Sequence, residues 1–227
     1  MKTTGGTDDQ KRRAGERAAA EVEDGDVVGL GTGSTAAHAI RAIGEAIESG
    51  LDVRGVPTSF DARRRAREAG VPVRSLDEID GIDLAIDGAD RIDHDRTAIK
   101  GGGAAHAREK VVDAAADRFV VVADPSKVVD TLSHPIPLEV LPDARAAVER
   151  TVTALDGTPT LRRAEAKDGP VVTDNGNLIL DCAFGPVDDP EGMARALSDV
   201  PGVLEHGLFV DLVDAVYIGT DGGVEQL

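Results

Sequence analysis

The stretch Gly29-Leu30-Gly31-Thr32-Gly33-Ser34-Thr35 decides how this chain is interpreted. It follows the apolar pair Val27-Val28 and opens a helical pattern, so it joins a strand to a helix. Alternate glycines let backbone N–H groups approach a ligand closely, and hydroxyl groups and a helix N-terminus accompany them. The loop therefore predicts a phosphate site, although it is neither a P-loop nor a GxGxxG motif. A tight turn that binds nothing is the alternative.

Composition excludes several classes of partner. The chain has 227 residues, a formal net charge of −17, 2% aromatic residues and no tryptophan, so its core must consist of aliphatic residues and alanine. Such a charge disfavours binding to nucleic acid or to anionic membrane surfaces. No apolar stretch reaches transmembrane length, and no signal-peptide core follows Met1, so we expect a cytoplasmic protein. Cys182 lies in an apolar run and is expected to be a packed small hydrophobe.

Lysine is rare in this chain. It occurs only at positions 2, 11, 100, 110, 127 and 167, whereas arginine and aspartate abound. An acidic, lysine-poor surface favours a protein that works at high salt, where charge repulsion is screened. An ordinary acidic cytosolic protein is the alternative. A lysine retained in such a chain is informative, because its compact charge differs from that of arginine.

Strand and helix patterns alternate through the first part of the chain, which predicts a doubly wound α/β sheet. We expect helices over Asp9–Glu23, Ser59–Ala69 and Ala104–Ala116, a further helix containing Ile40, Ile43 and Ile47, and strands over Val27–Leu30, Val53–Val56, Val71–Val73, Ile82–Ile86 and Phe119–Ala123.

Beyond about Leu132 the order of elements becomes β-α-β-β-α-β, which is typical of a ferredoxin-like unit. The strands expected here are Pro137–Val140, Thr158–Arg162, Leu178–Cys182 and Leu204–Phe209, with helices over Asp143–Leu155 and Pro190–Leu197. A last strand, Ala215–Gly219, returns to the first sheet. The predicted domains are therefore residues 1–132 with 204–227, and residues 133–203.

Polar residues follow several of the expected strands, at the edge where open parallel sheets bind ligands. Asp87 and Asp90 flank Gly88-Ala89 in a tight turn, where they either accept backbone hydrogen bonds or act on a sugar. A metal site is disfavoured, because no histidine or third carboxylate stands at ligand spacing. The five histidines have no partner in a recognisable catalytic motif, so none is assigned to chemistry.

Lys100, Glu109 and Lys127 complete the candidate residues. Lys100 precedes Gly101-Gly102-Gly103, whose amides, together with the lysine charge, suit an anion or a developing oxyanion. A solvated loop lysine is the alternative. Glu109 lies within a predicted helix, where a solvent-facing role is the default.

Several motifs in register resemble ribose-5-phosphate isomerase, type A. They are Gly29–Thr35, Asp87–Asp90, Lys100–Ala105, Arg108-Glu109-Lys110, Ala123–Lys127, Val171–Asn177 and Ile218-Gly219-Thr220. The order and spacing match from about Lys11 to Gly222. Pro125 stands where many members have a small residue, which affects the stiffness of that loop.

The resemblance implies interconversion of ribose 5-phosphate and ribulose 5-phosphate in the pentose phosphate pathway, without metal or cofactor. It also implies a Rossmann-like catalytic domain with an inserted ferredoxin-like lid, in a homodimer or homotetramer. Glu109 would be the proton acceptor and Lys100 would stabilise an enediolate oxygen. Asp87 or Asp90 would assist ring opening or bind hydroxyl groups. The substrate would contact Lys11, Thr32, Gly33, Ser34, Thr35, Asp87, Gly88, Ala89, Asp90, Lys100, Gly101, Gly102, Gly103 and Lys127, and Arg12 could share the role of Lys11.

Two other classes of function stay open at this point. A noncatalytic sugar-phosphate sensor could keep the phosphate loop, although it would be expected to lose Glu109 and to carry a DNA-reading module. An amino-sugar phosphate isomerase/deaminase or an acyl-CoA transferase on a related sheet is the other alternative. A deaminase is expected to use a histidine-containing acid/base arrangement, which the sequence does not reveal.

Overall fold

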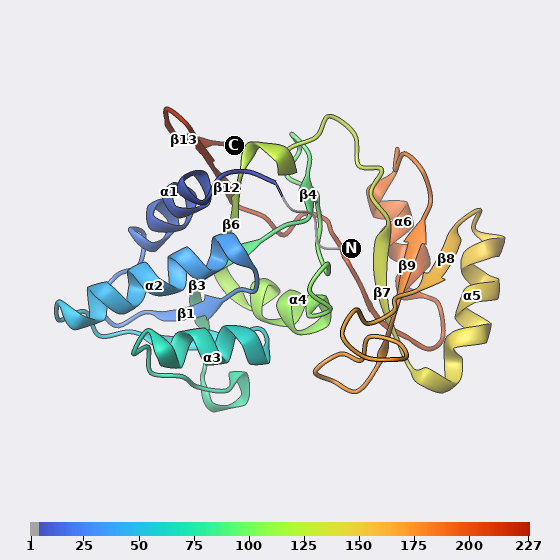
Figure 1. Ribbon diagram of the computed structural model, residues 1–227, viewed down its shortest axis with the longest axis horizontal. Helices are drawn as coiled ribbons and strands as arrows, with labels where there is room; N and C mark the ends of the chain where they lie inside the picture. Colours follow the sequence, from blue (N-terminus) through green and yellow to red (C-terminus); the bar gives the residue numbers. More distant parts are fainter. Residues whose placement is uncertain (1–4) are drawn as a thin grey trace. The chain divides into compact units, whose positions relative to one another are not determined.

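The computed structural model describes residues 5–227 (Figure 1). Residues 1–4, which the first predicted domain includes, lie outside the described residues. The chain forms two compact units. The larger consists of residues 5–89, Arg108–Val128 and Asp211–Leu227, and the smaller of Asp90–Ala107 and Val129–Val210. The fold is α/β, with a mixed, mostly parallel sheet in the larger unit and separate antiparallel sheets in the smaller one.

The larger unit is built on a six-stranded sheet in the order β13-β12-β6-β3-β1-β2. All neighbouring pairs are parallel except β12 and β13, which pair antiparallel. The strands span Val27–Leu30 (β1), Arg54–Pro57 (β2), Ile82–Gly88 (β3), Ala116–Ala123 (β6), Ala215–Thr220 (β12) and Gly223–Gln226 (β13). Strands β1, β3 and β6 are mostly apolar because helices bury both faces of the sheet.

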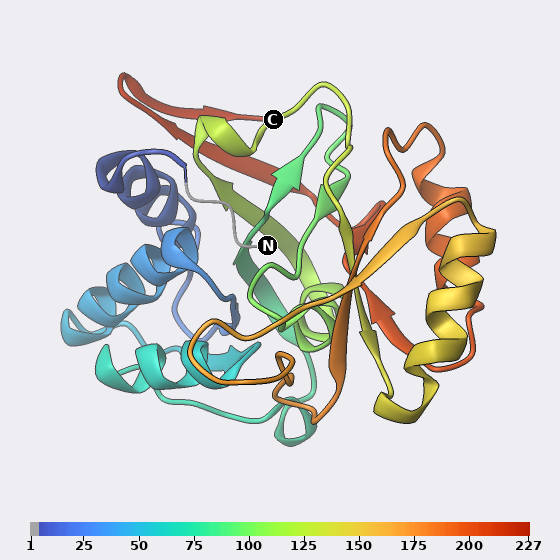
Figure 2. The ribbon, with the colours of Figure 1, turned by 45° about the vertical axis from the view of Figure 1, so that its right-hand side comes forward.

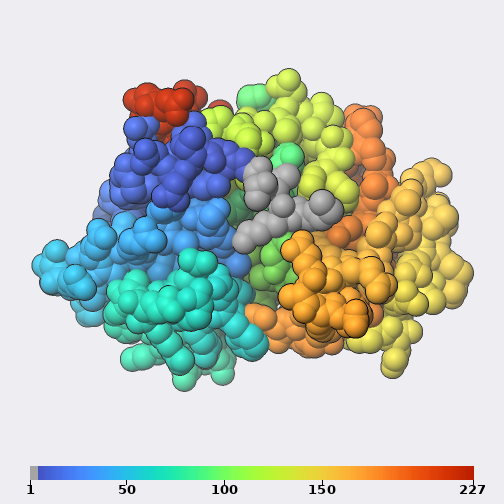
Figure 3. All heavy atoms as spheres, viewed as in Figure 1, coloured from blue at the N-terminus to red at the C-terminus, as the bar shows by residue number. Residues whose placement is uncertain are grey.

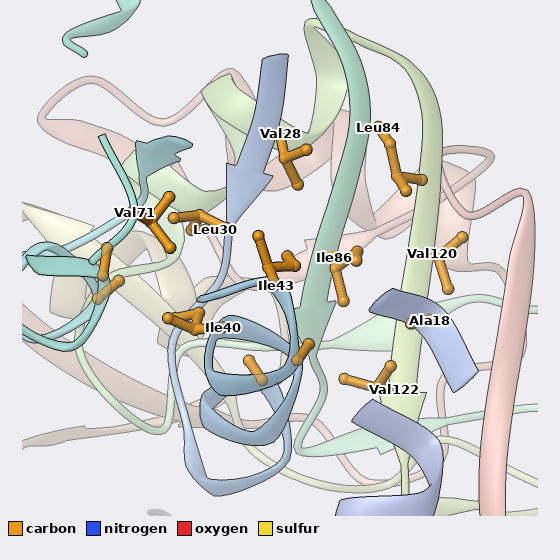
Figure 4. Packing of buried hydrophobic residues seen from close by; sticks show 14 of the residues in the cluster. Ala18, Val28, Leu30, Ile40, Ile43, Val71, Leu84, Ile86, Val120 and Val122 are labelled. Carbon is orange, nitrogen blue, oxygen red and sulfur yellow. The ribbon is translucent and has the colours of Figure 1, made fainter. Parts of the chain in front are cut away.

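Helices α1 (Asp8–Ala19), α2 (Ser34–Glu48) and α3 (Phe60–Glu68) pack on one face of this sheet. Their core is aliphatic, as the composition predicts, with Val28, Leu30 and Ile86 among its members (Figure 4). The outer surfaces of these helices appear as blue to teal spheres in Figure 3.

Helix α4 (His106–Ala114) covers the opposite face of the six-stranded sheet. Its Val112 packs with Val56 and Ile82. A Cβ added to Gly29, whose neighbours in β1 belong to the first core, would lie 2.8 Å from the Val112 side chain. Alternation of side chains along a strand explains this division between the two faces.

The smaller unit contains a four-stranded antiparallel sheet in the order β10-β7-β9-β8. Helices α5 (Arg145–Ala154) and α6 (Pro190–Ser198) lie on one side of it and share its core (Figure 2). A three-stranded sheet, β11-β5-β4, belongs to the same unit. The strands are Arg91–Ile92 (β4), Ala98–Ile99 (β5), Ile136–Val140 (β7), Thr158–Leu161 (β8), Leu178–Ala183 (β9), Val203–His206 (β10) and Leu208–Phe209 (β11).

Two expected strands differ in the structure. Val71–Val73 forms only an isolated bridge, between Val73 and Gly55, and therefore no strand. The single strand expected over Leu204–Phe209 is two strands in different sheets, β10 and β11, separated by Gly207. A Cβ at Gly207 would lie 2.1 Å from the carbonyl oxygen of Lys100, so only glycine fits where the chain changes partner.

Helix ends also differ from those expected. Helix α1 ends at Ala19 rather than Glu23, and α4 begins at His106 rather than Ala104. Ala104 has a φ of 59°, in the left-handed region, which cannot continue a right-handed helix. Short 3-10 turns, η1 (Leu76–Glu78), η2 (Pro125–Lys127) and η3 (Pro142–Ala144), were not expected.

Cys182 is fully buried, and burial raises the pKa of its thiol to about 12, which confirms a packed side chain rather than a nucleophile. Among the residues described, none of the helices combines the length and apolar character needed to cross a membrane.

Candidate active site

The glycine loop lies at the carboxyl edge of the six-stranded sheet, where the winding direction changes. The parallel strands lie in the order β2-β1-β3-β6-β12. From β1 the chain goes to β2 on one side, whereas β3 and the later strands lie on the other side of β1. Loops at such a switch point diverge to opposite faces and leave a crevice for a ligand. Gly31 to Thr35 follow β1 at this point, and Asp87 lies at the end of β3.

Backbone hydrogen bonds join the two loops at this edge. The Gly31 N–H donates to the carbonyl of Ile86 over 2.9 Å. The Asp87 carboxylate accepts from the N–H groups of Thr32 (2.9 Å) and Gly88 (2.6 Å) through the same oxygen, Oδ1. A Cβ on Gly31 would lie 2.2 Å from that carboxylate, which explains the glycine. The Asp87 side chain is fully buried and fixed by backbone donors on one of its oxygens.

The start of helix α2 offers backbone donors to an anion. Gly33 is the N-cap residue, with a φ of 125° that favours glycine, and it has no side chain to accept from the first turn. Ser34, the first helical residue, is exposed, and Thr35 is buried. The first-turn N–H groups and the helix dipole therefore face the loop with no side-chain cap in competition.

A pair of hydroxyl residues that the sequence reasoning missed contacts Thr32. The Thr32 Oγ1 atom lies 2.7 Å from Ser59 Oγ and 3.0 Å from Thr58 Oγ1. Ser59 also caps α3 by accepting from the Ala62 N–H over 3.0 Å. The available signal was position, because Thr58 and Ser59 directly follow β2 at the same edge of the parallel sheet.

The second glycine loop belongs to the smaller unit. Lys100 is 2% exposed, and its backbone N–H donates to the Gly207 carbonyl over 2.8 Å. Its side-chain Nζ lies 5.2 Å from the centroid of the Phe209 ring. Gly101 has a φ of 106°, and the Gly102 N–H donates to Asp90 Oδ2 over 2.6 Å. The alternative that Lys100 is a solvated loop residue is therefore wrong.

Arg162 and Asp181 approach the same loop from the four-stranded sheet. The Arg162 Nη1 atom donates to the carbonyls of Gly101 (2.8 Å) and Gly102 (3.3 Å). Its Nε donates to Asp181 Oδ2 over 2.8 Å, and its Nη2 donates to Oδ1 of the same carboxylate. Sequence reasoning gave no role to either residue, because neither lies in a recognisable motif.

Glu109, Lys127 and Lys11 belong to the larger unit. Glu109 on α4 is only 4% exposed, so the default of a solvent-facing helical glutamate is wrong. Lys127 is 8% exposed and ends the turn η2, which Asp124 caps through its carboxylate. Lys11 on α1 is half-buried.

The predicted site residues are divided between the two units. Asp90 and Lys100–Gly103 belong to the smaller unit, and the larger contains Lys11, Thr32–Thr35, Asp87, Gly88, Ala89, Glu109 and Lys127. Within residues 5–227, no group of three or more histidine, cysteine, aspartate or glutamate side chains is arranged to hold a metal ion.

A family model decides the relationship of this chain to known proteins. The model described as ribose 5-phosphate isomerase A (phosphoriboisomerase A) matches residues 54–223. The chain belongs to the ribose 5-phosphate isomerase A family. This membership sets aside the sensor, deaminase and transferase alternatives.

Curated relatives in this family match almost the whole chain. Ribose-5-phosphate isomerase A of Halorubrum lacusprofundi is 60% identical over 99% of this chain and 98% of its own length. The enzyme of Natronomonas pharaonis is 61% identical over 99% of both chains. These matches extend to the Gly29–Thr35 loop, which precedes the part covered by the family model.

Solved structures of the family have the same fold. The structure of ribose 5-phosphate isomerase A from Methanocaldococcus jannaschii superimposes with a TM-score of 0.94 at 43% identity, over 98% of this chain and 99% of that one. A D-ribose-5-phosphate isomerase in complex with phospho-erythronic acid gives a TM-score of 0.95, also at 43% identity, with the same coverage. The chain is thus an isomerase of ribose 5-phosphate in the pentose phosphate pathway.

Proposed function

We propose that Glu109 is the base that moves the proton between C2 and C1 of the substrate. Isomerisation of an aldose to a ketose removes a proton from the carbon next to the carbonyl and returns it to the neighbouring carbon through an enediolate. A carboxylate at hydrogen-bond reach of both carbons can do this without a cofactor. The observation that carries the proposal is the burial of Glu109 on a helix, where an ionisable group without a chemical role is usually solvated.

Lys100 is proposed to stabilise the oxygen that gains charge. In the enediolate, negative charge develops on the former carbonyl oxygen, and a fixed ammonium group inside the protein lowers the energy of that state. Lys100 supports this role because it is 2% exposed and its backbone is held by Gly207. Gly101–Gly103 are proposed to line the substrate site beside it, with the Gly103 N–H as a donor to the substrate, because the Gly102 N–H donates to Asp90.

Asp87 and Asp90 are proposed to act on the hydroxyl groups of the sugar or on ring opening. The closed ring of ribose phosphate opens when a proton moves from the C1 hydroxyl and another reaches the ring oxygen, which a carboxyl group can assist. Each aspartate is buried and accepts backbone N–H groups, which fixes the direction of its carboxylate. Either one suits either role.

The phosphate group is proposed to bind at the start of α2, with Lys11 as its nearest cation. The Asp8 carboxylate lies 3.1 Å from His38 Nε2, and a Cβ on Gly15 would lie 3.0 Å from the Thr35 carbonyl. Helix α1 therefore crosses the first turns of α2, and Lys11 lies between these two points of contact. Arg12 is less suited because its guanidinium is bound by Asp9 and Glu16 on its own helix. Lys127 is proposed as a further substrate ligand.

The finer description of the fold is also a proposal. The six-stranded sheet with helices on both faces supports a Rossmann-like doubly wound domain, formed by residues 1–132 and 204–227. The β7-α5-β8-β9-α6-β10 order and the sheet order β10-β7-β9-β8 support an inserted ferredoxin-like lid domain, predicted over residues 133–203, although β10 (Val203–His206) continues past that boundary. A homodimer or homotetramer in the cytoplasm, active without metal or cofactor, stays a prediction.

Replacement of the proposed base tests the mechanism. E109Q preserves shape and removes the base, so kcat should fall by about 10²–10⁴-fold. Turnover of ribose 5-phosphate and exchange of the substrate C2 hydrogen with deuterated water should fall together. E45Q, on the exposed side of α2, is the matched control and should retain both. Wild-type exchange in E109Q would remove Glu109 as the base.

A further inference from the structure

Arg162 holds one peptide group of the Lys100–Gly103 loop from the side opposite Asp90. The carbonyl of Gly101 accepts from Arg162 Nη1 over 2.8 Å and from the Ala104 N–H over 2.9 Å. The N–H of the same peptide group, which belongs to Gly102, donates to Asp90 Oδ2 over 2.6 Å. The Gly101–Gly102 peptide group is therefore bound at both its C=O and its N–H. The following peptide group is bound through the Gly102 carbonyl, which accepts from Arg162 Nη1 over 3.3 Å.

The orientation of Arg162 is set in turn by Asp181. Two donors of the guanidinium meet the two carboxylate oxygens, an arrangement that fixes the guanidinium plane. Burial alone would raise the pKa of Asp181, but the hydrogen bonds and charge of Arg162 outweigh it and lower the pKa, so the pair stays ionised near neutral pH. Arg162 is 9% exposed, so its charge is kept inside the unit.

We propose that Arg162 is a positioning residue of the isomerase, which directs the Gly103 N–H of the Lys100–Gly103 loop toward the substrate. The inference rests on the proposed substrate-binding role of that loop. In a trans peptide the N–H points away from the C=O, so binding of the Gly102 carbonyl by Arg162 turns the Gly103 N–H to the other side. Gly103 is exposed, which leaves that donor open to a ligand.

A loop of three glycines needs such a clamp. Glycine has the widest choice of backbone conformations, so an unclamped loop would lose its donor geometry in many conformations. Donors that stabilise developing charge act best when they are fixed before the reaction begins. Arg162, directly after β8, and Asp181 on β9 supply this fixation, so that the four-stranded sheet contributes to catalysis through the loop without contact with the substrate.

Kinetics of matched variants test this role. R162Q should lower kcat by about 10–10²-fold, with a smaller change in KM, because misplaced groups act mainly on the reacting state. R162K should recover little, since an ammonium cannot reproduce the fork, and D181N should fall between R162Q and wild type. R163Q changes the adjacent, exposed arginine and should retain wild-type kinetics.

A second readout separates positioning from simple stabilisation. Amide hydrogen exchange of Gly102 and Gly103, measured on folded protein, should accelerate in R162Q relative to the amides of β7 and β9. Affinity for phospho-erythronic acid should fall in the same variant. If R162Q does not fold, R162K and D181N are measured in its place. R162K retains the positive charge, and D181N retains the shape of the aspartate side chain.

Two outcomes distinguish failure of the inference from failure of the proposed site. If K100M loses activity while folded R162Q, R162K and D181N keep wild-type kcat and loop exchange, then the positioning role is wrong and the loop assignment stands. If K100M itself keeps wild-type kcat, then the proposed role of the loop is wrong, and the inference about Arg162 falls with it.

Discussion

Lys100 and Glu109 belong to the minority of charged side chains that are buried, which also includes Asp113 and Glu139. Charged residues make up 30% of the sequence, and most of those on helices lie at the surface. Lys100 and Glu109 are 2% and 4% exposed. Ionised groups are seldom retained inside a protein unless they have partners or chemistry, and this is why both residues are candidates for the active site.

The compact charge of Lys100 is expected to be indispensable. K100M should lower kcat/KM by about 10²–10⁴-fold, and K100R should recover little because a planar guanidinium does not fit a site shaped for an ammonium. K167M, on an exposed loop lysine, is the control. Steady-state kinetics with ribose 5-phosphate measure all three, and near-wild-type K100M would contradict the role in enediolate stabilisation.

Ser59 links the start of helix α3 to the glycine loop after β1. Its hydroxyl caps α3 and lies 2.7 Å from Thr32 Oγ1, so one side chain serves both the helix and the loop after β1. Ser75 also caps a short helical turn, η1, but makes no contact with Thr32 among the bonds of residues 5–227.

Removal of the two caps should therefore have different effects. S59A should lower the free energy of unfolding by about 1 kcal/mol and also raise KM for ribose 5-phosphate. S75A should lower stability without a change in KM. Urea unfolding measures the free energy of unfolding, and steady-state kinetics measure KM. An equal KM in both variants would show that the Thr32 hydroxyl takes no part in substrate binding.

A second polar cluster connects α1 to the sheet. Glu21, just after α1, accepts from the Tyr217 hydroxyl on β12 and from Arg118 Nε on β6 over 3.0 Å, and Arg17 stacks 4.3 Å from the Tyr217 ring centroid. Burial on its own would raise the pKa of Glu21, but its bonds to Tyr217 and Arg118 outweigh burial and lower the pKa.

This cluster gives a pH-dependent contribution to stability. A carboxyl group whose pKa is lower in the folded state stabilises the fold above its unfolded pKa, and the effect is lost as the pH falls through the folded value. E21Q should therefore unfold about 1–2 kcal/mol more easily than wild type near neutral pH. The difference in urea unfolding should shrink at a pH below the normal glutamate range. A constant difference across that range would show that the carboxylate charge contributes nothing.

Local patterns predicted the elements that carry their own signal. The β1 strand and its glycine loop were predicted within residues 27–35, and Phe119–Ala123 lies within β6, because apolar runs and glycines are properties of short segments. The two-residue strands β4 and β5 escaped prediction, and β11 was predicted only as the end of a longer strand, since these strands exist through pairing of segments distant in the chain.

The candidate site shows the same limit. The family motifs placed Lys100, Glu109 and Asp87 among the candidates before any geometry was known, and their catalytic roles remain predictions. Thr58 and Ser59 could have been found from their position after β2. The contacts of Arg162 with Gly101 and Gly102 could not, because they depend on how β8 and β9 fold back on a loop distant in sequence.

At the scale of the whole molecule, net charge is the dominant property. The chain has a formal net charge of −17 and six lysines, and its relatives include enzymes of Halorubrum lacusprofundi and Natronomonas pharaonis. A dianionic sugar phosphate approaches such a protein against its field, which the proposed phosphate site at the α2 N-terminus would have to overcome locally.

Salt should therefore assist this enzyme. At 1 M salt the Debye length is about 3 Å, so repulsion from distant carboxylates is screened while hydrogen bonds within the site persist. Turnover of ribose 5-phosphate should persist or rise from low to molar potassium chloride. A steady loss of kcat/KM with added salt would contradict the interpretation of the acidic surface as an adaptation to salt.

The missing side chain at Gly31 constrains how this site can evolve. Any larger residue would push against the Asp87 carboxylate and shift the junction of β1 and β3 that carries it. New substrate preferences are thus not accessible by single changes at this position. New preferences are expected from exposed positions such as Ser34, where a substitution changes the surface of the loop without moving the junction of β1 and β3.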